Sequence, residues 1–312
     1  PPPPPFFLHH YPAIRHSSTS RGLGDVYKRQ RGCDEYILKI VEKLSPYVIT
    51  TINARGILGD HSMCIPASPT LKTVRKELKK ADIVLAVGTE FGETDYDMYK
   101  DGNFPKLKKL IRVDINKTQL TKNIQPHLSI RSDAIHFFKK LSEILLVKKH
   151  YKKSSLQTPQ TAKIIRKLCL KEIEPKFKVP LNLISTISSN FPDAILVGDS
   201  TQPTYAGNLY TKTSKQGKWF NSATGYGTLG YAPPASIGAK LAKPNKPVIC
   251  IVGDGGLQFS LSELMTASEE KIAVIFLIWN NFGYKEIKDL SLIHISEPTR
   301  RRGISYAVFC LK

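Results

Sequence analysis

The chain has 312 residues and is 41% hydrophobic, which allows two domains with proper cores. Its formal net charge of +20 raises nucleic-acid binding as one interpretation. However, the lysines are scattered through helical segments such as 70–80 and 163–171, where they suit solvated faces. They do not alternate with the aromatic residues that base stacking requires. We therefore expect no nucleic-acid partner.

The cysteines and the apolar runs bear on the compartment. The five cysteines show no C-x-x-C pair and no ligand-like spacing, which favours a reducing compartment over a zinc site or a disulfide framework. The longest uninterrupted apolar run, Ile272 to Trp279, is too short to span a bilayer. We expect a cytoplasmic protein without a membrane partner.

The two ends of the chain differ from the sequence between them. Residues 1–30 begin with a proline tract, have no periodicity and lack the order of a signal peptide. The strings GLGDVYKRQ, near the start, and SLIHISEPTR, near the end, resemble translated sequencing adapters. We expect residues 1–30 and 290–312 to be artefactual or disordered, and the genuine chain to be truncated at both ends.

Residues 31–147 alternate helices and strands in a Rossmann-like order. The pattern predicts helices over 34–44 and 71–80 and strands over 48–52, 83–87 and 111–113. It contains no G-x-G-x-x-G, so these residues alone do not require a nucleotide. The polar, charged segment 148–160 is expected to be a linker.

Residues 161–289 are expected to form a second domain with the same alternation. The pattern predicts helices over 161–172, 181–189 and 260–270 and strands over 194–197, 248–252 and 273–279. The last two strands show little polar alternation, which is typical of strands buried on both faces of a parallel sheet. Ser260 and Glu263 have the spacing of a capping box at the start of the last helix. The predicted fold class is α/β, with two doubly wound parallel-sheet domains.

Three apolar strands of the second domain each end in a polar turn that contains glycine. The turns are 198–202, 253–256 and 280–283. If the strands are neighbours in one parallel sheet, the turns converge on one crevice at the carboxyl edge, where open α/β sheets bind ligands. This convergence predicts a binding site without reference to any family.

The residues in these turns suit a metal-bound diphosphate. The glycines at 253, 255 and 256 let the backbone approach phosphate oxygens closely. Asp254 offers an anionic oxygen, Asn281 a neutral one and Gly283 a turn with an inward carbonyl, while two diphosphate oxygens and a water complete an octahedron for Mg²⁺. The alternative is that both turns merely close their strands, with Asp254 and Asn281 as caps.

The pair of turns resembles the signature of thiamine-diphosphate (ThDP) enzymes. That signature is GDG, 24 intervening residues and NN, here followed by Phe and then Gly-Tyr. The resemblance implies ThDP and Mg²⁺ as cofactors, with the metal held by Asp254, Asn281 and the Gly283 carbonyl. It also implies that the Gly227 carbonyl meets the exocyclic amine of the cofactor and that Leu229 props its two rings into a bent shape. The full set of implied cofactor residues is Thr201, Gly227, Thr228, Leu229, Gly253, Asp254, Gly255, Gly256, Asn281, Gly283 and Tyr284.

The hydroxyl that meets the diphosphate is assigned to Thr201, with Ser200 as the alternative. An unrelated interpretation takes Gly-Asp-Ser as the start of a GDSL-type serine esterase with Ser200 as nucleophile. Those enzymes place Asp-x-x-His late in the chain, whereas here Asp289 stands five residues before His294. This spacing disfavours the esterase.

The central region resembles the same superfamily, that of acetolactate synthases and 2-oxo acid decarboxylases, in ADIVLAVGTEF, LIRVDIN and RSDA. Some members hold FAD in this domain and others use it as a spacer; the spacer is favoured here because no dinucleotide fingerprint is legible. The resemblance implies a 2-oxo acid substrate and a homodimer or homotetramer. It also implies an activating glutamate from a separate N-terminal domain, so no catalytic residue is assigned in this chain, which we expect to be inactive alone.

The string GDSTQPTYAGNLY indicates which branch of the superfamily is nearer. It is most similar to guanidino-oxopentanoate (2-ketoarginine) decarboxylases. Acetolactate synthases usually have Gly-Gln-His-Gln in the corresponding loop, whereas this chain has Ser200 to Pro203 there. We therefore favour a decarboxylase and keep an acetolactate synthase-like carboligase as the alternative.

Overall fold

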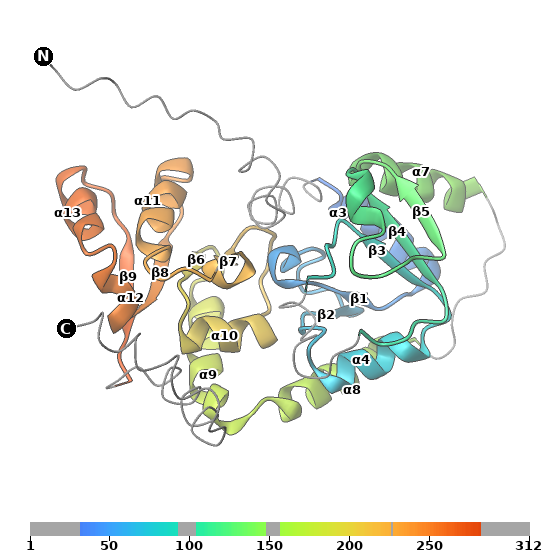
Figure 1. The fold of residues 1–312 in the computed structure, drawn as a ribbon, viewed down its shortest axis with the longest axis horizontal. Coiled ribbons are helices and arrows are strands. Elements are labelled where there is room, and N and C mark those ends of the chain that lie inside the picture. The colour runs from blue at the N-terminus through green and yellow to red at the C-terminus, as the bar shows by residue number, and fades with distance from the viewer. Residues whose placement is uncertain (1–31, 93–103, 148–156, 226, 282–312) are drawn as a thin grey trace, which may run out of the picture.

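The computed structural model describes residues 32–92, 104–147, 157–225 and 227–281. It has an α/β fold in two regions, each with parallel β-sheet (Figure 1), as the sequence predicted. The elements of the first region are α3 (Asp34–Leu44), β1 (Val48–Ile49), the 3₁₀ turn η1 (Ile52–Ala54), β2 (Cys64–Ile65), α4 (Lys72–Lys80), β3 (Val84–Val87), β4 (Leu110–Asp114), the 3₁₀ turn η2 (Lys117–Leu120), β5 (Leu128–Arg131) and α7 (Ala134–Val147).

The first region contains a parallel sheet of order β3-β4-β5 and a separate parallel pair, β1-β2. Helices α3 and α7 pack on each other through one apolar cluster that includes Ile37 and Val41 of α3 and Phe138 and Leu145 of α7. Helix α3 has the bounds that its amphipathic pattern predicted. The predicted strand at 48–52 is shorter, because residues 52–54 turn into η1.

The second region is built on a four-stranded parallel sheet of order β7-β6-β8-β9. Strand pairs that are distant in sequence therefore lie side by side, as parallel strands require crossover connections. Its elements are α8 (Pro159–Glu172), α9 (Pro175–Asn190), β6 (Ile195–Gly198), α10 (Gln202–Leu209), β7 (Trp219–Asn221), the 3₁₀ turn η3 (Ser222–Thr224), α11 (Ala232–Ala242), β8 (Val248–Gly253), α12 (Asp254–Gln258), α13 (Ser262–Glu269) and β9 (Ile275–Trp279).

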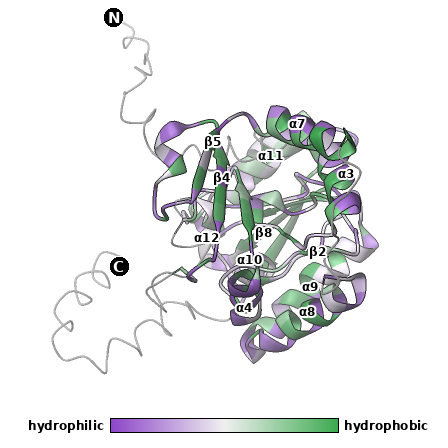
Figure 2. Ribbon diagram, turned by 90° about the vertical axis from the view of Figure 1, so that its right-hand side faces the viewer, coloured by the Kyte–Doolittle hydropathy of each residue, from purple (hydrophilic) through white to green (hydrophobic). Residues whose placement is uncertain are grey.

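Burial on both faces holds for β8 and not for β9. Every residue from Val248 to Val252 is buried, and the strand is coloured as hydrophobic in Figure 2. In β9, by contrast, Ile275 and Ile278 are 54% and 50% exposed. Among the described residues β9 pairs on one side only, with β8, so it is an edge strand and the prediction of full burial was wrong for it.

The helices between the two sheets begin earlier than predicted. Helix α8 starts at Pro159, where Thr158 and Thr161 form a reciprocal capping box, so residues 159–160 are helical rather than linker. Its buried residues Ile165 and Cys169 pack against Leu71 and Val74 of the first region. Helix α9 starts at Pro175, six residues before the predicted start. Proline is favoured at these first-turn positions because its missing N–H has no partner there anyway.

The two regions are fastened by the loop that follows β1. Arg55 is fully buried and its guanidinium donates to Asn208 O of α10 at 3.1 Å and to Thr50 Oγ1 at 3.3 Å. A side chain on Gly56 would come within 2.2 Å of the Lys215 backbone, so the two loops touch at that glycine. An antiparallel bridge between Ala67 and Tyr210 extends the contact.

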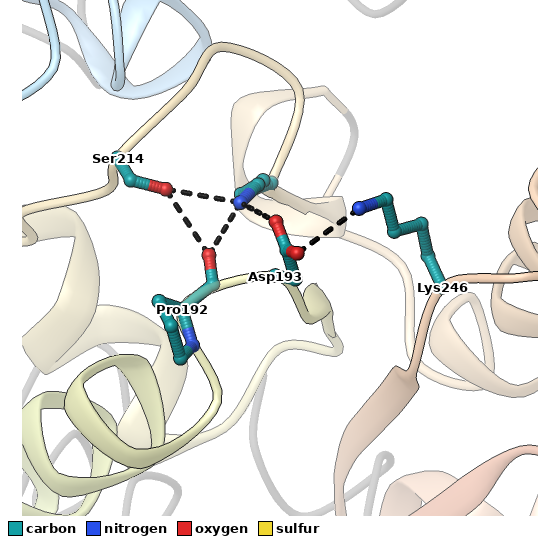
Figure 3. Close-up of polar contacts among 5 residues, drawn as sticks. Pro192, Asp193, Ser214 and Lys246 are labelled. Atoms are coloured by element: carbon teal, nitrogen blue, oxygen red, sulfur yellow. Dashed lines mark hydrogen bonds and ion pairs between the residues drawn. The ribbon is translucent and has the colours of Figure 1, made fainter.

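Ion pairs connect the amino ends of β6, β7 and β8 (Figure 3). Lys218, just before β7, donates to Asp193 Oδ1 at 3.0 Å, to Ser214 Oγ at 2.9 Å and to the Pro192 carbonyl. Lys246, before β8, lies 3.1 Å from Asp193 Oδ2. The two ammonium groups lower the pKa of Asp193 to about 2. This cluster is at the sheet edge opposite to the polar turns.

The cysteines of the described residues, Cys33, Cys64, Cys169 and Cys250, are buried thiols that form no disulfide with one another. Burial raises the pKa of Cys250 to about 12, which keeps it protonated and unreactive. Within the described ranges, every helix is too short or too polar to traverse a lipid bilayer.

Candidate functional site

The carboxyl ends of β6, β8 and β9 lie side by side at one edge of the second sheet. Strands β6 and β8 pair with Gly198 opposite Ile251, and β8 and β9 pair with Gly253 opposite Trp279. The prediction that these three strands are parallel neighbours is therefore confirmed, and the described residues that follow them begin at the same edge; residues 282 and 283 of the third turn lie outside the described residues.

The first two turns are in direct contact. A Cβ on Gly253 would lie 3.3 Å from Thr201 Oγ1, and one on Gly256 would lie 3.3 Å from Asp199 Oδ2. Thr201 is buried at the start of α10, with its hydroxyl beside the Gly253 backbone. Gly255 and Gly256 are buried in the short helix α12. Larger residues at 253 and 256 would crowd this contact, so the glycines allow the two turns to approach.

Asp254 and Asn281 occupy neighbouring strand ends. Asp254 is exposed and directly follows β8, whereas Asn281 stands two residues beyond the end of β9. Because Gly253 is in register with Trp279, Asp254 is level with the residue before Asn281 on the adjacent strand. Both side chains thus belong to the same edge of the sheet. Gly283 and Tyr284 lie outside the described residues.

The donor set at this edge is small. In the part of the chain that the structure describes, three or more His, Cys, Asp or Glu side chains nowhere gather as a group able to hold a metal ion. One carboxylate and one amide oxygen are nevertheless suited to Mg²⁺, which is commonly bound by one or two carboxylates together with phosphate oxygens and water. Asp254 and Asn281 therefore fit a metal that arrives with a phosphorylated ligand, and they do not form a complete protein-only cage.

The glycine loop between η3 and α11 forms the next side of the site. Gly227 and Gly230 have φ angles of +67° and +77°, in the left-handed region that favours glycine. A Cβ on Gly230 would lie 2.7 Å from the Cβ of Phe259, so the loop packs tightly on the segment after α12. Thr228 is exposed and Leu229 is 43% exposed, whereas a core leucine would be buried. Leu229 is thus available to a ligand.

Asp199 contacts the first turn, the glycine loop and the turn after β8, and no role was predicted for it from the sequence. Its carboxylate is fully buried and accepts the Ser200 N–H at 2.7 Å and the Gly230 N–H at 2.8 Å. Further N–H groups of Tyr231 and Ala232, at the start of α11, point to the same carboxylate. Burial raises its pKa, and the backbone N–H groups oppose this rise. The only signal in the sequence was an acidic residue that directly follows a buried strand.

Ser200 and Gln202 connect the first turn to the glycine loop and to the end of β9. Ser200 Oγ lies 2.9 Å from the Gly227 carbonyl and 2.9 Å from Ser222 Oγ. Gln202 Oε1 accepts from the indole N–H of Trp279 at 3.3 Å, which ties the first turn to the end of β9. The two hydroxyls that the sequence left as alternatives therefore face different ways: Thr201 faces the Gly253 turn, and Ser200 faces the glycine loop. Neither partner of the Ser200 hydroxyl is a base that would activate a nucleophile.

The predicted capping box at Ser260 and Glu263 was wrong. Helix α13 begins at Ser262 instead of Ser260, its N-cap position is Leu261, and its cap makes no side-chain hydrogen bond. The Ser260 hydroxyl is buried without a partner among the described residues, and it sits near Gly230. The turn that follows α12 determines the backbone here, since Glu263 N–H donates to the Ser260 carbonyl and not to its side chain.

Comparison with known sequences assigns the class of protein that this site indicates. Residues 199–304 match the C-terminal TPP binding domain of thiamine pyrophosphate enzymes, and residues 24–141 match the central domain of the same enzymes. The chain belongs to the thiamine pyrophosphate enzyme family, in which thiamine pyrophosphate is ThDP.

Individual relatives fall in two branches of that family. The chain is 33% identical over 263 residues to the probable 2-ketoarginine decarboxylase AruI of Pseudomonas aeruginosa, covering 82% of this chain and 45% of that protein. It is 33% identical over 214 residues to the acetolactate synthase large subunit of Buchnera aphidicola subsp. Acyrthosiphon pisum, covering 67% and 36%. It is 29% identical over 247 residues to the acetolactate synthase isozyme 1 large subunit of Escherichia coli, covering 77% and 39%. The chain thus spans less than half the length of these relatives.

Proposed function

We propose that this chain binds Mg²⁺ and ThDP at the carboxyl edge of the β6-β8-β9 strands, as part of a 2-oxo acid decarboxylase. The observation that carries the proposal is that the carboxyl ends of β6, β8 and β9 are neighbours, because the residues that follow them are together expected to hold the diphosphate and its metal ion. The resemblance to the probable 2-ketoarginine decarboxylase AruI favours a guanidino-oxopentanoate as the 2-oxo acid. The bound cofactor supplies an electron sink for the pair released when a 2-oxo acid loses carbon dioxide.

Each part of the edge has a distinct task in this proposal. Asp254 and Asn281, with the Gly283 carbonyl, hold the metal, because oxygen ligands suit Mg²⁺. The glycine backbone at 253, 255 and 256 and the Thr201 hydroxyl take the diphosphate. The contact of Thr201 with the Gly253 turn supports this, since it leaves a hydroxyl beside a backbone that has no side chain in the way.

The glycine loop takes the aminopyrimidine end of the cofactor. Its proposed contacts are the Gly227 carbonyl, the adjacent Thr228 and the side chain of Leu229. The positive φ of Gly227 and the exposure of Leu229 support this assignment, because the first fixes an unusual carbonyl direction and the second keeps an apolar side chain free for a ring. The aromatic Tyr284 completes the proposed set.

An acetolactate synthase-like carboligase is the second candidate, supported by the similarity to the Buchnera and Escherichia coli enzymes. The two candidates share the cofactor and differ in the fate of the decarboxylated substrate. A decarboxylase releases an aldehyde after protonation, whereas a carboligase joins a second 2-oxo acid. Product analysis with one and with two 2-oxo acids separates them in the complete enzyme.

The central region is proposed to be a spacer without FAD. Arg112, buried in β4, donates to the carbonyls of Thr89, Lys122 and Ile124 and lies 4.7 Å from the ring of Phe91. The Thr89 carbonyl, just beyond the end of β3, where a Rossmann-like sheet would place a nucleotide, thus already accepts from a protein side chain, which supports the spacer. We also propose a cytoplasmic homodimer or homotetramer, as the family resemblance implies.

Calorimetry tests the proposal. The 312-residue chain should bind ThDP in the presence of Mg²⁺, and Asp254→Ala should weaken this binding by at least tenfold. The matched control is Asp82→Ala, which removes an exposed carboxylate paired with Lys108 in the central region and should leave binding unchanged. Equal binding by the wild-type chain and Asp254→Ala would contradict the proposal.

A further inference from the structure

The hydroxyl of Ser200 is held in a short chain of hydrogen bonds. It lies 2.9 Å from the Gly227 carbonyl and 2.9 Å from the hydroxyl of Ser222, which is buried. A carbonyl can only accept, and a hydroxyl has one hydrogen to donate. The Ser200 hydroxyl therefore donates its hydrogen to the Gly227 carbonyl, and the Ser222 hydroxyl must donate to the Ser200 oxygen. The direction of the chain is thus Ser222 to Ser200 to Gly227.

The same residues fix the peptide of Gly227 from its other end. The Gly227 N–H donates to the Ser222 carbonyl at 3.0 Å, while its own carbonyl accepts from Ser200. With φ at +67°, the residue is held in a left-handed conformation by bonds at both its N–H and its C=O. A Cβ on Gly227 would lie 3.8 Å from Ser200 Oγ, so an added methyl group would come into ordinary contact with this hydroxyl.

A carbonyl that accepts one hydrogen bond keeps a second lone pair for another donor. The Ser200 bond therefore directs the Gly227 carbonyl without using up its capacity. We infer that Ser200 is a positioning residue that aims the Gly227 carbonyl at the exocyclic amine of the cofactor, and so makes the site selective for an amine over an oxygen at that position. This inference rests on the proposed function, and it assigns Ser200 to the aminopyrimidine rather than to the diphosphate.

The test compares two ligands by calorimetry in the presence of Mg²⁺. They are ThDP and oxythiamine diphosphate, in which an oxygen replaces the exocyclic amine. With the second ligand, the Gly227 carbonyl faces an oxygen that cannot donate a hydrogen bond to it. Wild-type chain should prefer ThDP. Ser200→Ala should lower this preference about tenfold, the scale of one lost hydrogen bond, and should leave the affinity for inorganic pyrophosphate with Mg²⁺ unchanged.

Two further variants complete the design. Ser236→Ala removes another buried hydroxyl, which donates to Ala232 O within α11, and it should keep the full preference for ThDP. Ser222→Ala removes the donor to Ser200 and should lower the preference by a smaller factor in the same direction. If circular dichroism shows that Ser200→Ala is unfolded, Ser222→Ala replaces it as the test of the hydrogen-bond chain.

The results separate the inference from the proposed function. If the wild-type chain binds neither ThDP nor pyrophosphate with Mg²⁺, the proposed function fails and the inference fails with it. If it binds ThDP but the preference is absent, or persists in full in Ser200→Ala, only the inference is overturned. Equal losses for ThDP and pyrophosphate in Ser200→Ala would move this hydroxyl to the diphosphate.

Discussion

Substitution of Gly230 by alanine should destabilise the second region, whereas the same substitution at Gly238 should stabilise it. At Gly230 an alanine meets two costs: a left-handed conformation, worth about 1 kcal/mol or slightly more, and a Cβ at 2.7 Å from the Cβ of Phe259, worth about 1–3 kcal/mol of overpacking. We expect a net loss of about 3 kcal/mol. Gly238 lies within α11, and an added Cβ there would meet no described atom outside its own helical turn within 4 Å, so alanine should gain about 1 kcal/mol of helix propensity.

The assay is urea unfolding followed by tryptophan fluorescence. The chain has two tryptophans, Trp219 and Trp279, and they lie in β7 and β9, so the signal reports on the second sheet. The two variants should move the urea midpoint in opposite directions without a change in slope. A wild-type midpoint for Gly230→Ala would refute the described conformation of the glycine loop and its packing against Phe259.

Three other predictions concern the domain contact, the ion pairs and the diphosphate. Arg55→Met should cost about 3 kcal/mol, because it leaves the buried Asn208 carbonyl without its guanidinium donor; a wild-type urea midpoint would contradict this. The pKa of Asp193 is lowered to about 2, so its stabilising effect should be present above pH 3.8 and lost as the pH falls toward 2. The urea midpoints of the wild-type chain and Asp193→Asn should therefore converge on acidification, and a gap that persists in acid would exclude the ion pairs as its source. Thr201→Val should weaken ThDP binding about tenfold in calorimetry with little change in unfolding, and an unchanged affinity would remove Thr201 from the diphosphate site.

The elements that could be predicted are those whose signal is local. Strands β6 and β8 are apolar runs that stop at Gly-Asp, and helix α3 carries an amphipathic repeat, so each was recognisable from a few adjacent residues. The meeting of the turns followed from one assumption, that the three strands are parallel neighbours, and the sheet order β7-β6-β8-β9 meets it.

The features that could not be predicted depend on distant partners. Strand β9 is as apolar as β8, yet among the described residues β9 has a strand neighbour on one side only, and Ile275 and Ile278 are exposed. The Asp199 carboxylate accepts a hydrogen bond from the N–H of Gly230, which is 31 residues further along the chain. Ser260 and Glu263 have capping-box spacing, but Ser260 belongs to the turn after α12. Helix α13 begins two residues later, at Ser262, so the Ser260 side chain is not at the N-cap position. Tertiary contacts therefore decide these positions.

The proposed cofactor site requires Asp254 and Asn281 to share one cation that is bound together with the diphosphate. The direct measurement is the affinity for Mn²⁺, a spectroscopic substitute for Mg²⁺, by electron paramagnetic resonance with saturating ThDP in the wild-type chain, Asp254→Ala, Asn281→Ala and the double variant. If both side chains bind one ion, their losses of Mn²⁺ affinity should not add. The double variant should then bind Mn²⁺ no more weakly than the single variant with the lower Mn²⁺ affinity. Additive losses, or wild-type affinity in either single variant, would show that the two side chains do not hold one metal ion.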